Sequence, residues 1–410
     1  MAKQHYTIWW GPPKKFSTHI AERKISWLEL FYDLVYVIVI SKITHYLAEH
    51  PSASGLLDYG YLFAMTFWGW YNGSMHHDVH GSPGIRTRFM TLWQMMAVGA
   101  LAVSLDSPSE SILNRTTISI MFLQLFITYL WWSVGIYDKL HRKFNLPYTF
   151  WFLSAFVLLL ITFWVPFPYK RIIFWLTLII NYLPFALTAR RLKKESMDYT
   201  LSSNMTERLG LFTIIIFGEA ILGVINGISH LAILDMSVWL CFGLGILIVF
   251  ALWWIFFSTI ADRECKKGMQ AGNIMSLLYF PTLASLGMVG AAFPALMENI
   301  ATKGNYFSNP LHIIFGTSIS LFLCCVTAIS QFLIYPLEYK KSKKIVQLFL
   351  VFIGVINLLL IFLFPVIPVF FYLLCIFISL MIVIVIMTYN WSRIELSKLS
   401  SEISDMKHTD

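Results

Sequence analysis

Twelve long apolar stretches divide this chain, and they leave few folds open to it. An α-helix needs about 20 mostly apolar residues to cross a bilayer, where each backbone polar group must find its partner within the segment. Only 13% of the residues are charged, against about 25% in soluble domains. A transmembrane β-barrel would show alternating segments of about ten residues instead. The sequence therefore predicts an all-α, polytopic helical membrane protein with these spans: 27–48, 56–78, 88–105, 116–137, 149–165, 171–189, 207–228, 236–260, 272–297, 310–335, 345–364 and 366–389.

The basic residues between these stretches predict an orientation. With the N-terminus inside, the inner segments hold 25 of the 30 Lys and Arg residues and the outer loops hold 4. Such a bias is typical of cytoplasmic loops. We predict a multi-pass protein of the bacterial cytoplasmic membrane, with both termini in the cytoplasm and the first span as an uncleaved anchor. The same loops account for the net charge of +8, so the lipid bilayer is the expected partner and nucleic acid is not.

The two halves of the chain show related patterns. The segment 68–70 (WGW) precedes Asp78, and the segment 253–254 (WW) precedes Asp262 with the same spacing from the last Trp. Six spans per half is an even number, so two such repeats would run parallel about an axis along the membrane normal. Chance recurrence of Trp in apolar sequence is the alternative. The predicted organisation is an N-terminal cytoplasmic segment, two six-helix repeats and a C-terminal cytoplasmic tail, at residues 1–26, 27–200, 201–390 and 391–410.

The C-terminal tail carries apolar residues at helical spacing, namely Leu396, Leu399, Ile403 and Met406. This pattern indicates a short amphipathic cytoplasmic helix. A frayed tail remains the alternative.

Two carboxylates lie within the first apolar stretch, at Glu29 and Asp33. With about 3.6 residues per helical turn, they share one face of the helix. An acidic side chain costs about 2–4 kcal/mol near the centre of a membrane-spanning helix and less near its ends. We therefore expect this face to point into a protected polar interior. Lys42 falls on the opposite face and cannot be the partner of Asp33 within this helix.

A third acid, Glu219, lies near the middle of the seventh span. Arg208 shares its face but lies about 16 Å away along the helix axis, too far for a direct contact. Gly218 and Gly223 would let another backbone approach at this level. Two interpretations stay open: a proton or cation site, or a structural glutamate that is hydrogen-bonded or paired with an arginine of another span.

Charged and histidine residues also gather at the ends of spans. His76, Asp78 and His80 could ligate a metal if their helix continued, but the glycines and proline that follow indicate that it stops there. They are weak metal candidates. The acids Asp78 and Asp262 are each followed by arginine. We interpret these groups as charges that fix the membrane topology or, alternatively, as a gate; they are Asp78, Arg86, Asp262 and Arg263.

Aromatic residues make up 17% of the chain. Many tryptophans cluster near span ends, where an interfacial aromatic belt explains most of them; an aromatic-lined pocket is the alternative. The chain has no G-x-S-x-G, H-E-x-x-H, Walker A or D-D-x-x-D motif, so an enzyme is not favoured. The sequence leaves any cofactor unknown.

Two motifs carry a family resemblance. The segments WLELFYDLVYV at 27–37 and ERLGLFTIIIFGE at 207–219 closely resemble the bacterial low temperature requirement A (LtrA) family. Because the motifs lie in different halves, the resemblance spans most of the chain. It implies a multi-pass membrane protein, and the family name implies a link with growth in the cold. The motif positions of the family fall on Glu29, Asp33, Arg208 and Glu219.

A weaker resemblance is to lysosomal potassium channels, whose two six-span repeats each open with Phe-Ser-Asp. Here the first half has Phe31-Tyr32-Asp33, and the second half has Phe212-Thr213-Ile214 without an acid. This likeness slightly favours a channel.

These observations favour a secondary transporter or channel for a small solute or ion. The residues assigned to proton, cation or substrate binding are Glu29, Asp33, Arg208 and Glu219. A membrane-embedded enzyme or scaffold acting on lipid or the cell envelope, and a membrane sensor, are the alternatives. A homo-oligomer is possible, and the sequence does not name the substrate.

Overall fold

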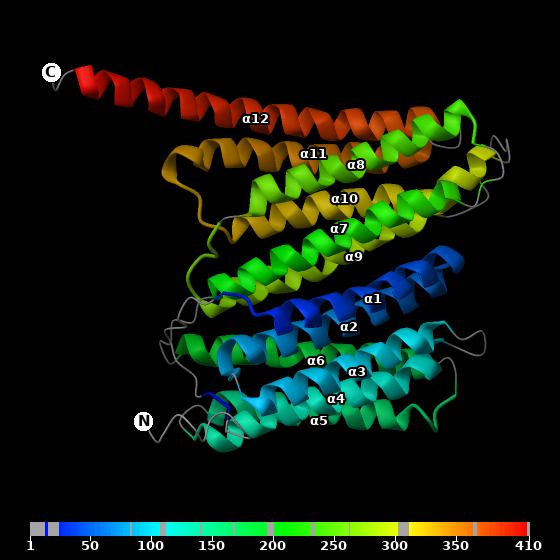
Figure 1. Cartoon of the computed structure of the whole chain (residues 1–410), viewed down its shortest axis with the longest axis vertical. Coiled ribbons are helices and arrows are strands. Elements are labelled where there is room, and N and C mark those ends of the chain that lie inside the picture. The colour runs from blue at the N-terminus through cyan, green and yellow to red at the C-terminus, as the bar shows by residue number, and fades with distance from the viewer. Residues whose placement is uncertain are drawn as a thin grey trace. The chain divides into compact units, whose positions relative to one another are not determined.

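The computed structural model describes the chain apart from residues 1–12, 15–23, 83, 107–111, 140–141, 167–168, 195–200, 230, 232–233, 262, 302–310, 364–366 and 408–410. Its described residues form twelve α-helices and one short 3-10 helix, η2 (Leu337–Tyr339) (Figure 1). The predicted all-α class is confirmed. The helices are α1 (Trp27–Glu49), α2 (Ala53–His80), α3 (Ile85–Leu105), α4 (Ile112–Tyr137), α5 (Arg142–Ile161), α6 (Tyr169–Lys194), α7 (Ser203–Ser229), α8 (Met236–Ile260), α9 (Met269–Ala301), α10 (Leu311–Gln331), α11 (Lys340–Leu363) and α12 (Val369–Lys407).

Eight helices of the described chain are long and apolar enough to cross a membrane, namely α3, α4 and α7 to α12. A shorter apolar segment, Asn145–Ile161, lies within α5. The prediction of a polytopic helical membrane protein is therefore confirmed, while membrane crossing by all twelve helices stays a prediction. Helix α12 continues to Lys407, so the expected tail helix is an extension of the last span.

The helices divide into two compact units. Unit 1 comprises Met1–Ile216 and Lys266–Phe280, and unit 2 comprises Phe217–Cys265 and Pro281–Asp410. Helices α7 and α9 each contribute their N-terminal part to unit 1 and their C-terminal part to unit 2. Arg208 consequently belongs to the same unit as the acids of α1.

Unit 1 is organised around α2, which packs against α1, α4 and α6. Helices α3, α4 and α5 lie side by side (Figure 1). Trp68 and Trp70 are 1% and 0% exposed, and Trp68 donates to the carbonyl oxygen of Asn181 over 3.1 Å. An interfacial belt, predicted for most of the tryptophans near span ends, does not explain these two, because their indoles fill the interior of the unit and bind polar groups there.

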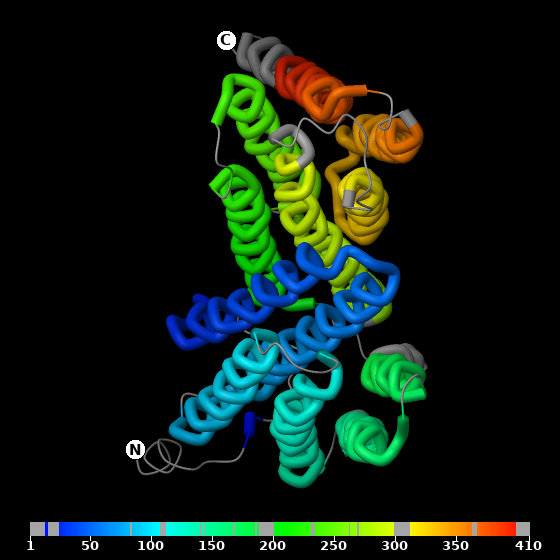
Figure 2. Tube along the Cα trace, turned by 90° about the vertical axis from the view of Figure 1, so that its right-hand side faces the viewer, coloured from blue at the N-terminus to red at the C-terminus, as the bar shows by residue number. Residues whose placement is uncertain are grey.

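In unit 2, α10, α11 and α12 lie next to one another (Figure 2), and α8 packs against α10 and α12. The C-terminal part of α7 meets α9 where Gly223 faces Gly290: a Cβ built on Gly223 would overlap the Gly290 backbone. This close approach was expected at Gly223. Gly218 was expected to behave in the same way, but a Cβ there would have no neighbour within 4 Å.

Candidate functional site: a buried charge cluster beside a polar pocket

The site begins with the cap of α1. Ser26 is the N-cap, and its backbone N–H and hydroxyl donate to Glu29 Oε2 over 2.9 and 2.8 Å. The Glu29 N–H donates back to the Ser26 hydroxyl. This reciprocal capping box satisfies two donors that the first turn would otherwise leave open. It also fixes the Glu29 carboxylate, so that its other oxygen, Oε1, faces the interior of the unit.

Arg208 of α7 binds both carboxylates of α1. Its Nε donates to Asp33 Oδ2 over 3.3 Å, its Nη2 donates to Asp33 Oδ1, and its Nη1 donates to Glu29 Oε1 over 3.4 Å. All three side chains are 1% exposed. Glu29, Asp33 and Arg208 are called here the charge cluster. The expected shared face of the two acids is confirmed, because one guanidinium contacts both.

Aromatic side chains enclose the charge cluster. The Trp70 indole N–H donates to Asp33 Oδ1 over 2.7 Å. The guanidinium of Arg208 lies 5.8 Å from the Trp70 ring centroid and 6.0 Å from that of Tyr32, within cation–π range. Trp70 in turn stacks on Phe212 at 4.2 Å, one turn beyond Arg208. These contacts pack aromatic rings against the charge cluster.

His77 of α2 is a further neighbour of the charge cluster. Its Nε2 lies 3.9 Å from Glu29 Oε1, and an imidazole is cationic only when it is protonated. Glu29 Oε1 therefore lies close to both the Arg208 guanidinium and the His77 imidazole. Buried carboxylates are costly unless they are paired, and these contacts pair Glu29.

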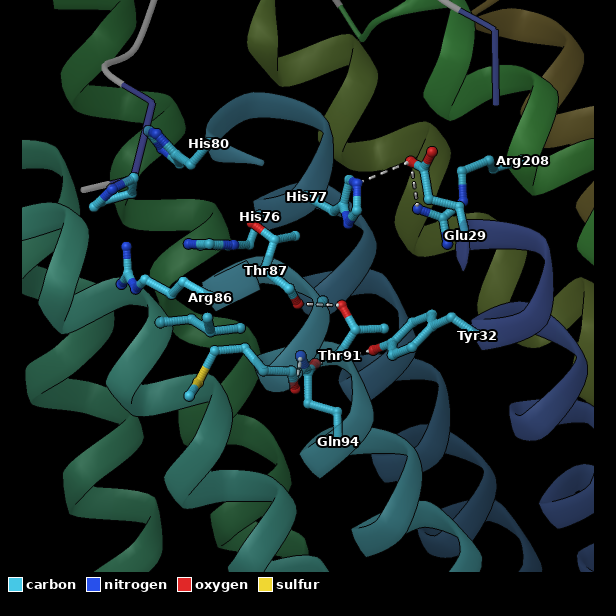
Figure 3. Close-up of a pocket in the computed structure, with 14 residues that line it drawn as sticks. Glu29, Tyr32, His76, His77, His80, Arg86, Thr87, Thr91, Gln94 and Arg208 are labelled. Carbon is cyan, nitrogen blue, oxygen red and sulfur yellow. Dashed lines mark hydrogen bonds and ion pairs between the residues drawn. The ribbon is translucent and has the colours of Figure 1, made fainter. Parts of the chain in front are cut away.

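A polar pocket opens beside Glu29 and is drawn in Figure 3. Its wall comes from the N-terminal ends of α1 and α3, the C-terminal end of α2, and Arg208. The space suffices for about two water molecules. Glu29 and His77 lie on one side of the pocket, and Arg86 lies on the other (Figure 3). The buried cluster therefore borders the pocket through Glu29 and Arg208.

A hydroxyl and amide network lines the same pocket. The Tyr32 hydroxyl lies 3.1 Å from the Tyr36 hydroxyl and 3.1 Å from Gln94 Oε1. Gln94 is held in turn by α3, where its Nε2 donates to the carbonyl oxygen of Met90. Gly73 is the point on α2 where this network comes close, since a Cβ there would overlap the Tyr32 hydroxyl.

The segment Pro13–Lys14 closes one side of the pocket. Pro13 is buried and lines it. The Lys14 N–H donates to the His80 carbonyl oxygen over 3.0 Å, and His80 Nδ1 lies 2.8 Å from the Lys14 carbonyl oxygen. The C-terminal end of α2 thus anchors part of the N-terminal segment.

The other span-end groups have separate partners. Asp78 accepts hydrogen bonds from Ser202 Oγ over 2.5 Å and from Asn204 Nδ2 over 2.9 Å. His76 and His80 lie edge-on to Trp131, each about 6.1 Å from its ring centroid. Among the described residues no three His, Cys, Asp or Glu side chains lie together as a metal-binding group.

Arg86 lies in the first turn of α3, and its Nη2 donates to Ser133 Oγ over 2.5 Å. Arg263, in unit 2, lies 4.3 Å from the Tyr335 ring centroid and 5.3 Å from that of Trp391. Its predicted companion Asp262 lies outside the described residues. The assignment of these four charges to topology or gating stays a prediction.

Glu219 and Lys42 are not among the residues that line the pocket. Glu219 is half-buried in the part of α7 that belongs to unit 2, and it is not a lining residue of the pocket. Lys42 pairs with Asp106 over 2.8 Å. Sequence reasoning missed Trp70, His77 and Gln94 as neighbours of the acids. The Ser26-x-x-Glu29 spacing, a capping-box signal before an apolar run, was available to find the cap.

The long apolar helices of the described chain define the class of a multi-pass helical membrane protein. Residues 24–389 match the family described as bacterial low temperature requirement A protein (LtrA). The chain belongs to this family. It is also similar to an uncharacterised protein of Rhizobium meliloti (strain 1021), with 24% identity over 307 residues that cover 70% of this chain and 71% of the relative.

Proposed function

We propose that this LtrA protein is a secondary transporter or channel for a small ion or solute, with Glu29 as the group that takes up and releases a proton. One observation carries the proposal: a buried cluster of two carboxylates and one guanidinium borders a polar pocket through Glu29. Ionisable groups at such depth are typical of ion and proton pathways.

The three residues of the charge cluster have different roles in this proposal. Asp33 binds Arg208 and Trp70 and does not line the pocket, so it is a positioning residue. Arg208 holds the two acids together. Glu29 lines the pocket and lies 3.9 Å from His77, so a proton can pass between this pair and the pocket. Glu219 remains a proposed second proton or cation site, in unit 2.

The test is proton flux in proteoliposomes. Purified full-length protein is reconstituted in sodium chloride with a pH-sensitive dye inside, and proton entry is driven in separate experiments by a potassium diffusion potential and by an inward pH gradient. We expect the wild-type protein to acidify the vesicles faster than protein-free liposomes do, and Glu29→Gln to reduce that rate at least tenfold. Glutamine also completes a capping box, so this variant removes the charge while keeping the cap of α1.

A matched control is Asp58→Asn. Asp58 is also a buried acid of unit 1, bound to Arg171 through two hydrogen bonds of 3.2 and 3.1 Å, but it does not line the pocket. Its substitution should lower stability and leave the flux per folded molecule unchanged. Equal flux in wild-type and Glu29→Gln vesicles, or wild-type flux no greater than that of empty liposomes, would refute the proposal.

The proposal includes an orientation, with both termini in the cytoplasm of a bacterial cell. The distribution of Lys and Arg supports it. A fluorescent-protein fusion after Asp410 should fluoresce in cells, whereas an alkaline phosphatase fusion within 302–310 should be active. The opposite pair of readouts would reverse the orientation.

A further inference from the structure

The side of the pocket opposite Glu29 carries a buried cation. Arg86 is 6% exposed. Its partners among the described residues are neutral: Ser133 Oγ accepts from Nη2, and the Tyr129 ring lies 5.9 Å from the guanidinium. No carboxylate among the described residues lies within 4.0 Å of this guanidinium, although Arg171 of the same unit has one and Arg208 has two. A buried guanidinium without a counter-ion is costly.

A second group on this side has an unsatisfied polar atom. His76 is 8% exposed, lines the pocket, and its Nε2 has no hydrogen-bond partner in the described structure. Its ring lies 5.6 Å from that of His80, another lining residue. Buried polar atoms in native proteins nearly always have a partner. A ligand in the pocket that accepts a hydrogen bond would satisfy this nitrogen.

The local backbone adds to the positive potential. Arg86 and Thr87 stand in the first turn of α3, whose N-cap residue Gly84 makes no side-chain capping bond. The N-terminal end of a helix carries a partial positive charge and open N–H groups. Anions favour such an end when it is combined with a cationic side chain.

Charged groups of opposite sign lie on the two sides of the pocket. The Glu29 carboxylate lies on one side, and the Arg86 guanidinium lies on the other (Figure 3). We propose that the pocket binds a small monovalent anion between Arg86 and His76, and that this anion is the substrate that moves with the proton of Glu29. The substrate assignment rests on the proposed function; the anion site itself does not.

The size of the pocket limits the class of anion. With space for about two water molecules, it admits a halide, nitrate or formate and excludes sugar acids and nucleotides. A singly charged ion also matches the single uncompensated charge of Arg86. Chloride, nitrate and formate are therefore suitable probes, and gluconate is the anion that should not enter.

The test is the thermal stability of the purified full-length protein in detergent, titrated with each sodium salt against sodium gluconate at constant ionic strength. A ligand that binds only the folded state raises the unfolding midpoint with its concentration. We expect a saturable rise for at least one of the three small anions in the wild-type protein. In Arg86→Gln the apparent dissociation constant should increase at least tenfold, and in His76→Gln it should increase by a smaller factor.

Arg171→Gln is the matched control, because it removes a guanidinium of unit 1 whose charge Asp58 already balances. It should lower the unfolding midpoint but keep the anion dependence. If Arg86→Gln does not fold, Arg86→Lys and His76→Gln provide the comparison. Anomalous diffraction from bromide-soaked crystals should place one bromide between Arg86 and His76.

The outcomes separate the two proposals. Equal anion dependence in wild-type and Arg86→Gln protein, or no difference between the small anions and gluconate, would overturn the anion site. Anion binding without proton flux would overturn the transport function and, with it, the role of the anion as substrate. Proton flux that is unchanged when gluconate replaces the small anions would overturn the substrate assignment alone.

Discussion

At the residue scale, the sequence predicts that the two acids of α1 share one face, but it does not identify the residue that binds them. The spacing of Glu29 and Asp33 predicts one shared face, and a single guanidinium confirms it. Arg208 lies 175 residues from Asp33 along the chain. Helical periodicity describes neighbours within one helix, so it cannot identify which distant helix supplies a counter-charge. The resemblance to the LtrA motifs named Arg208, but only the structure brings it to the acids.

Removing Arg208 should destabilise the protein strongly. Arg208→Gln leaves two buried carboxylates without their cation, and breaking a buried ion pair costs about 3–5 kcal/mol. Arg208→Lys should recover only part of this loss, because an ammonium group cannot reproduce the three hydrogen bonds that the planar guanidinium makes to the two acids. The measurement is the unfolding midpoint in detergent. A change below about 0.5 kcal/mol in Arg208→Gln, typical of surface substitutions, would contradict the buried cluster.

The two buried tryptophans of α2 permit a matched comparison. Trp70→Phe removes a hydrogen bond to a carboxylate, worth about 1.5–3 kcal/mol, whereas Trp68→Phe removes one to a neutral carbonyl, worth about 0.5–1.5 kcal/mol. Both substitutions also delete a similar part of a buried ring. We therefore expect Trp70→Phe to be the more destabilising of the two in the same thermal assay. If Trp68→Phe is the more destabilising variant, the hydrogen bond from Trp70 to Asp33 contributes little to the free energy of unfolding.

At the element scale, helix existence was predictable and helix packing was not. Twelve apolar stretches predict twelve helices, because in a membrane the backbone has few other ways to satisfy its polar groups. Helix α12 extends well past the predicted end of its span at 389, because hydropathy shows where the apolar segment ends and not where the helix ends. The choice between Gly218 and Gly223 needed the structure, since either glycine could have faced a neighbour.

The α7–α9 crossing in unit 2 gives a prediction with an internal control. Gly223→Ala places a methyl group against the Gly290 backbone, and overpacking costs about 1–3 kcal/mol. Gly218→Ala meets no atom within 4 Å and should be neutral or stabilising by up to about 1 kcal/mol, since Ala favours helix over Gly. The measurement is the unfolding midpoint of each variant, compared with that of the wild-type protein. Equal effects would exclude a close approach at Gly223.

At the scale of the whole molecule, the predicted repeat remains a prediction. Trp68 and Trp70 are 1% and 0% exposed, whereas their proposed counterparts Trp253 and Trp254 are 38% and 37% exposed. The matching residues therefore occupy different environments, even if the halves share an ancestor. The two compact units also do not follow the order of the chain, because each combines two separate segments that contact one another. Part of α7 belongs with α1 to α6, and a chain division at the predicted boundary of 200 assigns Arg208 to the other fragment.

This arrangement predicts how the chain behaves when it is split between residues 200 and 201. The fragment 1–200 retains Glu29 and Asp33 but loses Arg208, so two buried acids lack their cation, at a cost of about 3–5 kcal/mol. Expressed alone, it should be degraded, and coexpressed 201–410 should restore its level in membranes. Coexpressed 201–410 with Arg208→Gln should fail to do so. If the fragment 1–200 accumulates equally in all three cases, the acids of α1 do not depend on α7, and unit 1 as defined by its contacts is not the unit that folds.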